Sequence, residues 1–181
     1  MGKVEKLFFV DVETTNLPEN DPEAEVIEIA CGVLDLRTWE TSGEWSTLVK
    51  HSRPLGDFTA KYFSRVDFSR ALDPSNAIET LIMRWRACAG SWSGQNPIFD
   101  LGFLRPLAAS CGYAWPGSPD VDYHRFDVAS MMLPYVLRGE VESVSLSKTR
   151  VWAGCEDEQA HRAAGDVSDT IRVFRRIMGR V

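Results

Sequence analysis

Residues 7–17 read LFFVDVETTNL, and this stretch decides the fold. The apolar run at 7–12 is interrupted only by Asp11 and has the length of a buried strand. Side chains alternate between the two faces of a strand, so Asp11 and Glu13 are expected to point the same way. Two adjacent carboxylates at the end of an apolar strand repel each other, and they suit a hard cation such as Mg²⁺ or Mn²⁺. Alternatively, both lie in water past a frayed strand end, and the pair taken alone favours this second interpretation.

Length and composition are those of a globular protein. The 181 residues fit one domain, 1–181, with 44% hydrophobic and 25% charged residues. No apolar run approaches the length of a membrane span, and the first residues lack a signal-peptide pattern. We therefore expect a cytoplasmic protein without a membrane partner. The four cysteines form no CxxC pair, which is typical of reduced thiols: Cys31, Cys88, Cys111 and Cys155.

The net charge of −6 argues against long, non-specific contacts with duplex nucleic acid, which favour a basic surface. The +4 of two bound divalent cations would reduce that charge to −2 and would concentrate positive charge at one site. Binding of nucleic acid at a strand end therefore stays open.

The rest of the chain alternates between strand and helix patterns. Apolar, β-rich runs at 25–36 and 39–49 flank turn residues and predict a hairpin. Residues 51–72 mix aromatic and basic side chains and predict either short helices on the core, which we favour, or a lid beside a substrate. Further patterns predict a short strand at 91–96 and helices at 73–90, 99–112, 127–137, 145–152 and around 167–178. Taken together, these elements predict an α/β domain with a mixed sheet.

Three helix details can be checked against a structure. Asp73-Pro74 predicts an N-cap followed by proline at the first helical position, and Gly90 predicts the end of that helix. Asp127 predicts the N-cap of a later helix. The last helix has an apolar face of Val167, Ile171, Phe174 and Met178, and the opposite face of Arg172, Arg175, Arg176 and Arg180 is more typical of a solvated surface than of a binding patch.

Three further residues extend the pair at 11 and 13. Asp100 follows a short strand in the segment QNPIFD, and the segment HRAAGD places His161 five residues before Asp166. In a regular helix these last two side chains would point about 140° apart. They can share a site only if the helix begins between or near them, and the acidic run at 156–158 is consistent with such a late start.

The order Asp-x-Glu, Asn-x-x-Phe-Asp, His-x-Ala-x-x-Asp resembles the three exonuclease motifs of the DEDDh family of 3′–5′ exonucleases, which includes ribonuclease T and the proofreading subunit of bacterial DNA polymerase III. The resemblance spans residues 7 to about 178 and implies a ribonuclease H-like fold, with a mixed five-stranded sheet flanked by helices. The sister DEDDy group has tyrosine where this chain has Arg162. Two departures are Gln95, where histidine is frequent, and Asn16, where glycine is usual but asparagine also tolerates a left-handed backbone.

The resemblance also implies hydrolysis of phosphodiester bonds with two divalent cations, Mg²⁺ or Mn²⁺. It implies that Asp11 bridges both cations, that Glu13 and Asp166 complete the first site, and that Asp100 holds the second, partly through water. His161 is implied as the general base that takes a proton from the attacking water, because imidazole titrates near neutral pH.

The implied substrate is the 3′ end of a nucleic acid. Leu17 is expected to wedge against the terminal bases, and Thr14 and Thr15 to donate hydrogen bonds to the 3′ end. The segment VETT at 12–15 favours single-stranded DNA over RNA, with a DNA polymerase as a candidate partner. The alternatives are an exoribonuclease that trims RNA 3′ ends, or an interaction subunit that keeps the fold without catalysis, against which the five intact motif residues argue.

Overall fold

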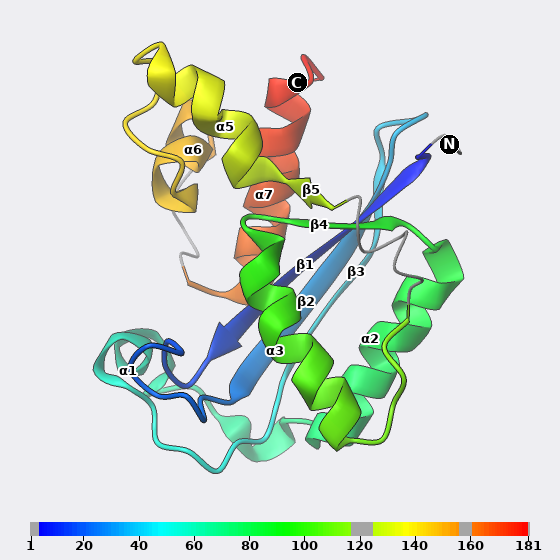
Figure 1. Cartoon of the computed structure of the whole chain (residues 1–181), viewed down its shortest axis with the longest axis vertical. Coiled ribbons are helices and arrows are strands. Elements are labelled where there is room, and N and C mark those ends of the chain that lie inside the picture. Colours follow the sequence, from blue (N-terminus) through cyan, green and yellow to red (C-terminus); the bar gives the residue numbers. More distant parts are fainter. Residues whose placement is uncertain (1–3, 117–124, 156–160, 181) are drawn as a thin grey trace.

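The computed structural model describes residues 4–116, 125–155 and 161–180. Its centre is a five-stranded sheet with the strand order β3-β2-β1-β4-β5 (Figure 1). β2 is antiparallel to both β1 and β3, whereas β4 runs parallel to β1 and β5 parallel to β4. The predicted mixed five-stranded sheet is therefore confirmed. Its strands are β1 (Lys6–Thr14), β2 (Val26–Asp35), β3 (Thr41–Leu48), β4 (Ser91–Gly94) and β5 (Phe126–Asp127).

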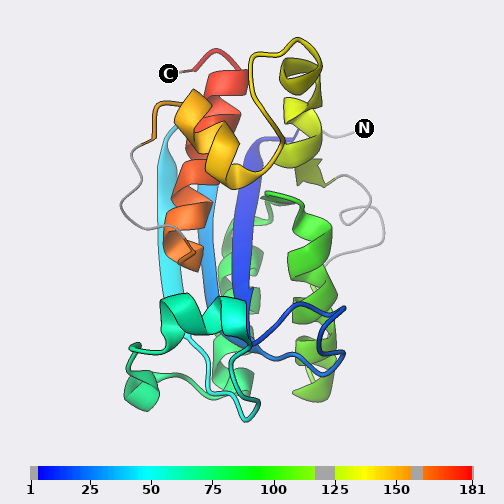
Figure 2. The same cartoon turned by 90° about the vertical axis from the view of Figure 1, so that its left-hand side faces the viewer.

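Helices cover both faces of this sheet (Figures 1 and 2). One face packs against α2 and α3, and the other against α5 and α7. The helices of the described residues are α1 (Asp57–Phe63), α2 (Pro74–Cys88), α3 (Pro97–Ser110), α5 (Val128–Leu137), α6 (Leu146–Trp152) and α7 (Ala163–Ile177), with a short 3₁₀ turn η1 (Phe68–Arg70).

β1 occupies the centre of the sheet because both of its faces are apolar. Phe8 and Val10 belong to the core beneath α2 and α3, while Leu7 and Phe9 belong to the core beneath α5 and α7. Leu7, Phe8 and Phe9 have no exposed surface. Burial of one such side chain stabilises a fold by about 1.5–3 kcal/mol, so this strand fixes the position of the carboxylates that follow it.

The boundaries of α2 differ in part from the prediction. The helix begins with Pro74 as expected, but the carboxylate of Asp73 makes no cap hydrogen bond and pairs instead with Lys50 at 3.0 Å. The helix ends at Cys88 with Ala89 in the left-handed region (φ 48°), rather than at Gly90. A Cβ at Gly90 would lie 3.1 Å from the backbone nitrogen of Phe8, so glycine is needed there for the close approach to β1.

α7 keeps most of its predicted pattern. The predicted apolar face is buried except at Met178, which lies beyond the end of the helix and is 47% exposed, so that part of the prediction is wrong. On the arginine face Arg175 is half-buried and donates a hydrogen bond to the carbonyl of Trp39, unlike the exposed side chains of Arg172, Arg176 and Arg180.

Several smaller expectations can also be compared with the structure. Asp127 caps α5 as predicted, because its carboxylate accepts from the backbone N–H of Ala129. All four cysteines are free thiols. Among the described residues no helix has the length and apolar character that a membrane crossing requires. Residues 117–124, between the helices predicted at 99–112 and 127–137, and the acidic run at 156–158 lie outside the described residues.

Candidate active site

Three carboxylates meet where β1 ends and α7 begins. Asp11 and Glu13 project from the same face of β1, as predicted, and Asp166 lies in the first turn of α7. One oxygen of each lies within 4.8 Å of the others. Oxygen atoms at this spacing are the donors that Mg²⁺ and Mn²⁺ prefer, so the three residues fit a divalent cation.

Asp100 approaches the same place from the opposite face of the sheet. It lies in the first turn of α3, is 2% exposed, and its Oδ1 accepts a hydrogen bond from the backbone N–H of Val12 at 2.9 Å. That bond ties the start of α3 to β1 directly between Asp11 and Glu13. The fourth predicted carboxylate therefore borders the group of three, although it is not part of the 4.8 Å cluster.

Burial and mutual repulsion disfavour the ionised forms of all four carboxyl groups. Burial, followed by the charges of Asp100, Asp166 and Glu13, raises the pKa of Asp11 well above its usual range. Burial is also the largest cause at Glu13, where the pKa rises to about 8, and at Asp100 and Asp166, where it rises to about 7. Without cations the ionised carboxylates repel one another, and bound cations would relieve that repulsion. Carboxyl groups with strongly perturbed pKa values are frequent at functional sites.

His161 stands just before the helix that carries Asp166. The helix begins at Ala163, after His161 in the left-handed region (φ 61°) and Arg162 in an extended conformation (φ −131°). The prediction that the helix starts between His161 and Asp166 is therefore confirmed. This break in the helix removes the 140° separation that a continuous helix would impose.

In the segment at 51–72 the favoured prediction of short helices is confirmed, whereas the alternative of a lid beside a substrate stays a prediction. The segment contains the short helix α1, whose Phe63 is buried, as expected of a helix packed on the core. The same helix exposes Phe58 (52%) and Tyr62 (38%), whose rings lie 5.2 Å and 4.1 Å from the ring of His161. Two exposed aromatic side chains thus adjoin the predicted general base.

Glu28 is a site residue that the sequence analysis missed. It lies on β2 directly opposite Glu13 and is 2% exposed. Its carboxylate accepts hydrogen bonds from the guanidinium of Arg162 and from the backbone N–H of Ala163. The available signal was a single acidic residue inside the otherwise apolar run VIEIACGVL, a pattern that requires a partner for the buried charge.

The predicted substrate-binding residues lie at the end of β1 and just beyond it, and two of them are engaged within the protein. The hydroxyl of Thr14 donates to the carbonyl of Asn16 at 2.8 Å, and that of Thr15 accepts from the backbone N–H of Glu25 at 2.9 Å. Thr15 has no exposed surface. Leu17, by contrast, is 42% exposed, so the prediction of a substrate contact now rests chiefly on it.

Asn16 does not adopt the left-handed conformation that the comparison with glycine suggested, since it is not among the described residues with positive φ. Its side-chain oxygen accepts from the backbone N–H of Leu17 at 2.9 Å. A Cβ at Gly56 would lie 2.8 Å from the side chain of Asn16, so the turn is closed by side-chain contact rather than by an unusual backbone.

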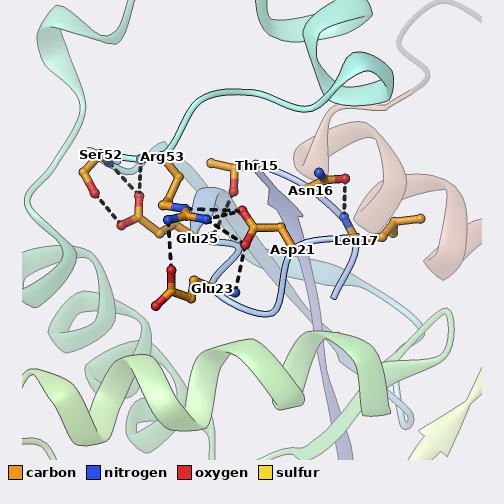
Figure 3. Close-up of polar contacts among 8 residues, drawn as sticks. All are labelled: Thr15, Asn16, Leu17, Asp21, Glu23, Glu25, Ser52 and Arg53. Atoms are coloured by element: carbon orange, nitrogen blue, oxygen red, sulfur yellow. Dashed lines mark hydrogen bonds and ion pairs between the residues drawn. The ribbon is translucent and has the colours of Figure 1, made fainter. Parts of the chain in front are cut away.

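A polar network holds the loop that carries Leu17 (Figure 3). The guanidinium of Arg53 donates to both oxygens of Asp21 and to Glu23 at 2.9 Å. Glu25 accepts from the backbone N–H groups of Ser52 and Arg53 at 2.6 and 3.0 Å. The β1–β2 loop is thereby fixed to the segment that leads into α1.

Gln95, which stands where histidine is frequent in the family, has a hydrogen-bond partner within the protein. Its amide donates to the carbonyl of Val144 at 2.5 Å, which ties the end of β4 to the segment before α6. The next residue, Asn96, is left-handed (φ 61°) and its N–H donates to Asp127 at 3.0 Å. The turn therefore places the start of α3, which carries Asp100, next to β1.

Solved structures with this fold are nucleases. E. coli exonuclease I, solved with a dT13 oligonucleotide, matches 97% of this chain with a TM-score of 0.80 at 19% identity. The nuclease domain of 3′hExo, a DEDDh family member solved with rAMP, matches 97% with a TM-score of 0.76 at 17% identity. A zinc-bound form of E. coli exonuclease I with single-stranded DNA matches 97% with a TM-score of 0.78 at 19% identity. The fold is thus that of the ribonuclease H-like nucleases.

Within that class, the chain belongs to the exonuclease family of the ribonuclease T type, whose model matches residues 8–174. It is accordingly a nuclease enzyme. The chain spans 41% of the length of the exonuclease I chain with dT13, 42% of that of the zinc-bound form and 92% of the 3′hExo domain. No curated protein matches it in sequence.

Proposed function

We propose that this protein is a metal-dependent 3′–5′ exonuclease that releases nucleoside 5′-monophosphates from unpaired 3′ ends, and that residues 1–181 form a single exonuclease domain. The observation that carries the proposal is the meeting of Asp11, Glu13 and Asp166 within 4.8 Å. All three are acidic residues whose ionised forms are disfavoured without a cation.

In this proposal two divalent cations, Mg²⁺ or Mn²⁺, are held by the four carboxylates. Asp11 would contribute to both sites, as the family resemblance implies. Glu13 and Asp166 complete one site, and Asp100 contributes to the other. Bound there, the cations activate water and stabilise the charge that develops on the phosphate.

His161 accepts the proton of the attacking water in this proposal. Imidazole suits the task because its unperturbed pKa of about 6.5 leaves a neutral nitrogen at physiological pH. The left-handed backbone at His161 keeps it outside α7, and Tyr62 fixes one side of its ring.

Exposed apolar side chains around the site favour unpaired substrates. Phe58 and Tyr62 on α1 offer rings for stacking with bases, a contact that requires bases free of a duplex. Leu17 provides an exposed apolar wedge near the start of the β1–β2 loop. Stacking tolerates both DNA and RNA, and we propose DNA as the preferred substrate because of the VETT segment of the first motif.

An RNA-trimming exoribonuclease remains the second candidate, because the related 3′hExo domain was solved with rAMP. An interaction subunit without catalysis is the least favoured alternative, because the chain keeps mutually repulsive carboxylates that such a subunit does not need. A DNA polymerase partner, which the resemblance suggested, gains no support from the family or from the related structures. A cytoplasmic location stays part of the proposal.

The test is degradation of 5′-labelled single-stranded DNA and RNA of one sequence, with Mg²⁺, with Mn²⁺ or with EDTA. We expect a ladder of stepwise shortened DNA products with either metal, slower loss of RNA, and no product in EDTA. Asp11→Asn protein is the control for contaminating nucleases. Cleavage of circular DNA, or release of the 5′ label as the first product, would contradict the proposal, and faster loss of RNA would establish the second candidate.

A further inference from the structure

An ion pair between the buried carboxylate of Glu28 and the half-buried side chain of Arg162 joins the central sheet to the backbone beside His161. The Arg162 guanidinium donates to Glu28 three times, from Nε at 3.0 and 3.2 Å and from Nη2 at 2.7 Å. The same carboxylate accepts from the backbone N–H of Ala163 at 3.1 Å. One side chain of β2 therefore fixes two consecutive residues and also satisfies an N–H group at the start of α7, which would otherwise lack a partner within the helix.

His161 needs such an anchor because its own backbone conformation is disfavoured. A residue with a side chain rarely adopts φ 61° unless the surroundings over-determine it. On its C-terminal side, Arg162 returns to an extended conformation and is held by Glu28. On its ring face, His161 lies against Tyr62 and Phe58 of α1. Arg162 also lies over the ring of Phe63, so the guanidinium contacts α1 as well.

Glu28 differs from the four carboxylates of the proposed metal site because it is paired with Arg162. Glu28 and Glu13 are cross-strand neighbours on one face of the sheet, so two like charges face each other. The bidentate contact with Arg162 pairs Glu28 with a positive charge and satisfies both of its oxygens, while the charge of Glu28 still contributes to the raised pKa values of Asp11, Glu13 and Asp166. Glu13, whose described contacts include no such guanidinium bond, is left for a cation.

We propose that Glu28 and Arg162 are positioning residues for the nuclease reaction: the pair holds His161 outside α7, against α1, in the geometry in which it accepts the proton of the attacking water. The inference rests on the proposed function of His161. The pair touches neither the substrate nor the cations and acts only through His161 and the start of α7.

The test compares Glu28→Gln and Arg162→Ala with wild type and with Arg37→Ala. Arg37 forms an ion pair with Asp35 at 3.0 Å, near the other end of β1, and serves as the matched control. Arg162→Ala leaves a buried carboxylate without its partner and is the more disruptive change, whereas Glu28→Gln keeps the shape of the side chain and is expected to fold. We expect kcat to fall about 10- to 100-fold in both, with KM and Mn²⁺ affinity within about twofold of wild type. Arg162→Lys, which keeps one bond and the charge, should recover part of kcat.

Two readouts separate positioning from a general structural effect. In a His161→Gln background, Glu28→Gln should cost less than about twofold, because a residue that acts through His161 has nothing left to position. In NMR spectra the ring protons of His161, identified by their loss in His161→Gln, should show the ring-current shift of Tyr62 in wild type and lose it in Glu28→Gln.

Additive losses in the double variant, or a ring-current shift that persists in Glu28→Gln, would overturn the inference. So would a full kcat in Glu28→Gln if His161→Gln is inactive. If His161→Gln itself keeps the wild-type rate, the proposed role of His161 fails instead, and the NMR shift alone decides whether the pair holds the imidazole.

Discussion

Two acidic clusters lie on either side of Thr15 in the sequence, and their carboxylates have opposite properties. Before it, burial and mutual repulsion raise the pKa values of Asp11 and Glu13. After it, the hydrogen bonds from Arg53 hold the pKa of Asp21 below its usual range. Burial acts to raise the pKa of Glu25, but hydrogen bonds from Arg53 and Ser52 outweigh burial and lower it.

The difference lies in the partners rather than in the number of carboxylates. The loop cluster at 21–25 is neutralised by Arg53 and holds a loop in place (Figure 3). At the cluster at the end of β1, burial outweighs the nearby guanidinium groups: Arg162 is bound by Glu28, and the charge of Arg150 lowers the pKa of Asp166 without offsetting the effect of burial. A protein that keeps repulsive carboxylates beside well-paired ones keeps them for a cation. Each prediction below acts on one cluster and leaves the other as its reference.

The largest expected effect follows from removing a shared carboxylate. Asp11→Asn and Asp166→Asn should lower the rate of single-stranded DNA cleavage by more than about 10⁴-fold, because each variant removes a cation ligand and its charge. Both variants should unfold at higher temperature than wild type in EDTA, because repulsion is reduced. Asp21→Asn, in the loop cluster, is the control and should keep turnover. Near-normal turnover in either site variant would disprove the assignment.

A somewhat smaller effect is expected at His161, where chemistry can be separated from cation binding. His161→Gln keeps a hydrogen-bonding group but cannot accept the proton, so we expect a rate loss of about 10²–10⁴-fold. Mn²⁺ affinity, measured by calorimetry, should stay within about twofold of wild type. Loss of Mn²⁺ binding would show that the imidazole is a ligand and not a base.

The sequence predicted the cation cluster better than it predicted the surroundings of that cluster. Asp11 and Glu13 are set by the period of one strand, and the apolar run before them fixes that strand in the core. The late start of α7 followed from the geometric conflict between His161 and Asp166. These are local relations, which a short segment contains in full.

The parts that were missed depend on contacts between distant segments. Glu28 and Arg162 are 134 residues apart, and neither the strand nor the helix pattern indicates that they meet. The network of Arg53 with Asp21 likewise joins residues 32 positions apart. Thr14 and Thr15 are a more local case, because the residues that bond their hydroxyl groups, Asn16 and Glu25, lie in the adjoining β1–β2 loop. Pairing across such distances is decided by the fold.

The third prediction is that the two clusters contribute to stability with opposite dependences on pH. The pKa values at Glu13 (about 8) and at Asp100 and Asp166 (about 7) exceed those of an unfolded chain, which lie near 4. The stability that these groups contribute is therefore fully present below about pH 4 and is lost as pH rises through about 7–8. For Asp21 the folded pKa is lowered, so its contribution is present above about pH 4 and is lost as pH falls further.

Urea unfolding between pH 5 and 8 measures the first of these changes. In EDTA the free energy of unfolding should decrease over this range by on the order of a few kcal/mol, since each tenfold change in proton affinity is worth about 1.4 kcal/mol. Saturating Mg²⁺ should flatten the curve, because cations favour the ionised carboxylates. Glu13→Gln should reduce the slope in EDTA. A free energy of unfolding that does not change with pH in EDTA would contradict the raised pKa values of these carboxyl groups.

The smallest effect is expected from the loop cluster, and it should appear in KM rather than in kcat. Arg53→Ala removes the hydrogen bonds to Asp21 and Glu23, so the loop that presents Leu17 loses part of its attachment to the segment before α1 and keeps the backbone bonds to Glu25. The proposed cation ligands lie on β1, α3 and α7 and are expected to keep their positions. We therefore expect Mn²⁺ affinity and kcat to stay within about twofold of wild type, with KM for single-stranded DNA raised about two- to tenfold, on the scale of one lost apolar contact. Leu17→Ala should raise KM by a similar factor, and Arg53→Ala combined with Leu17→Ala should raise it little further, because both changes remove the same wedge. A fall in kcat without a change in KM would show that the loop cluster supports the cation site, and the separation between the two clusters would then be wrong.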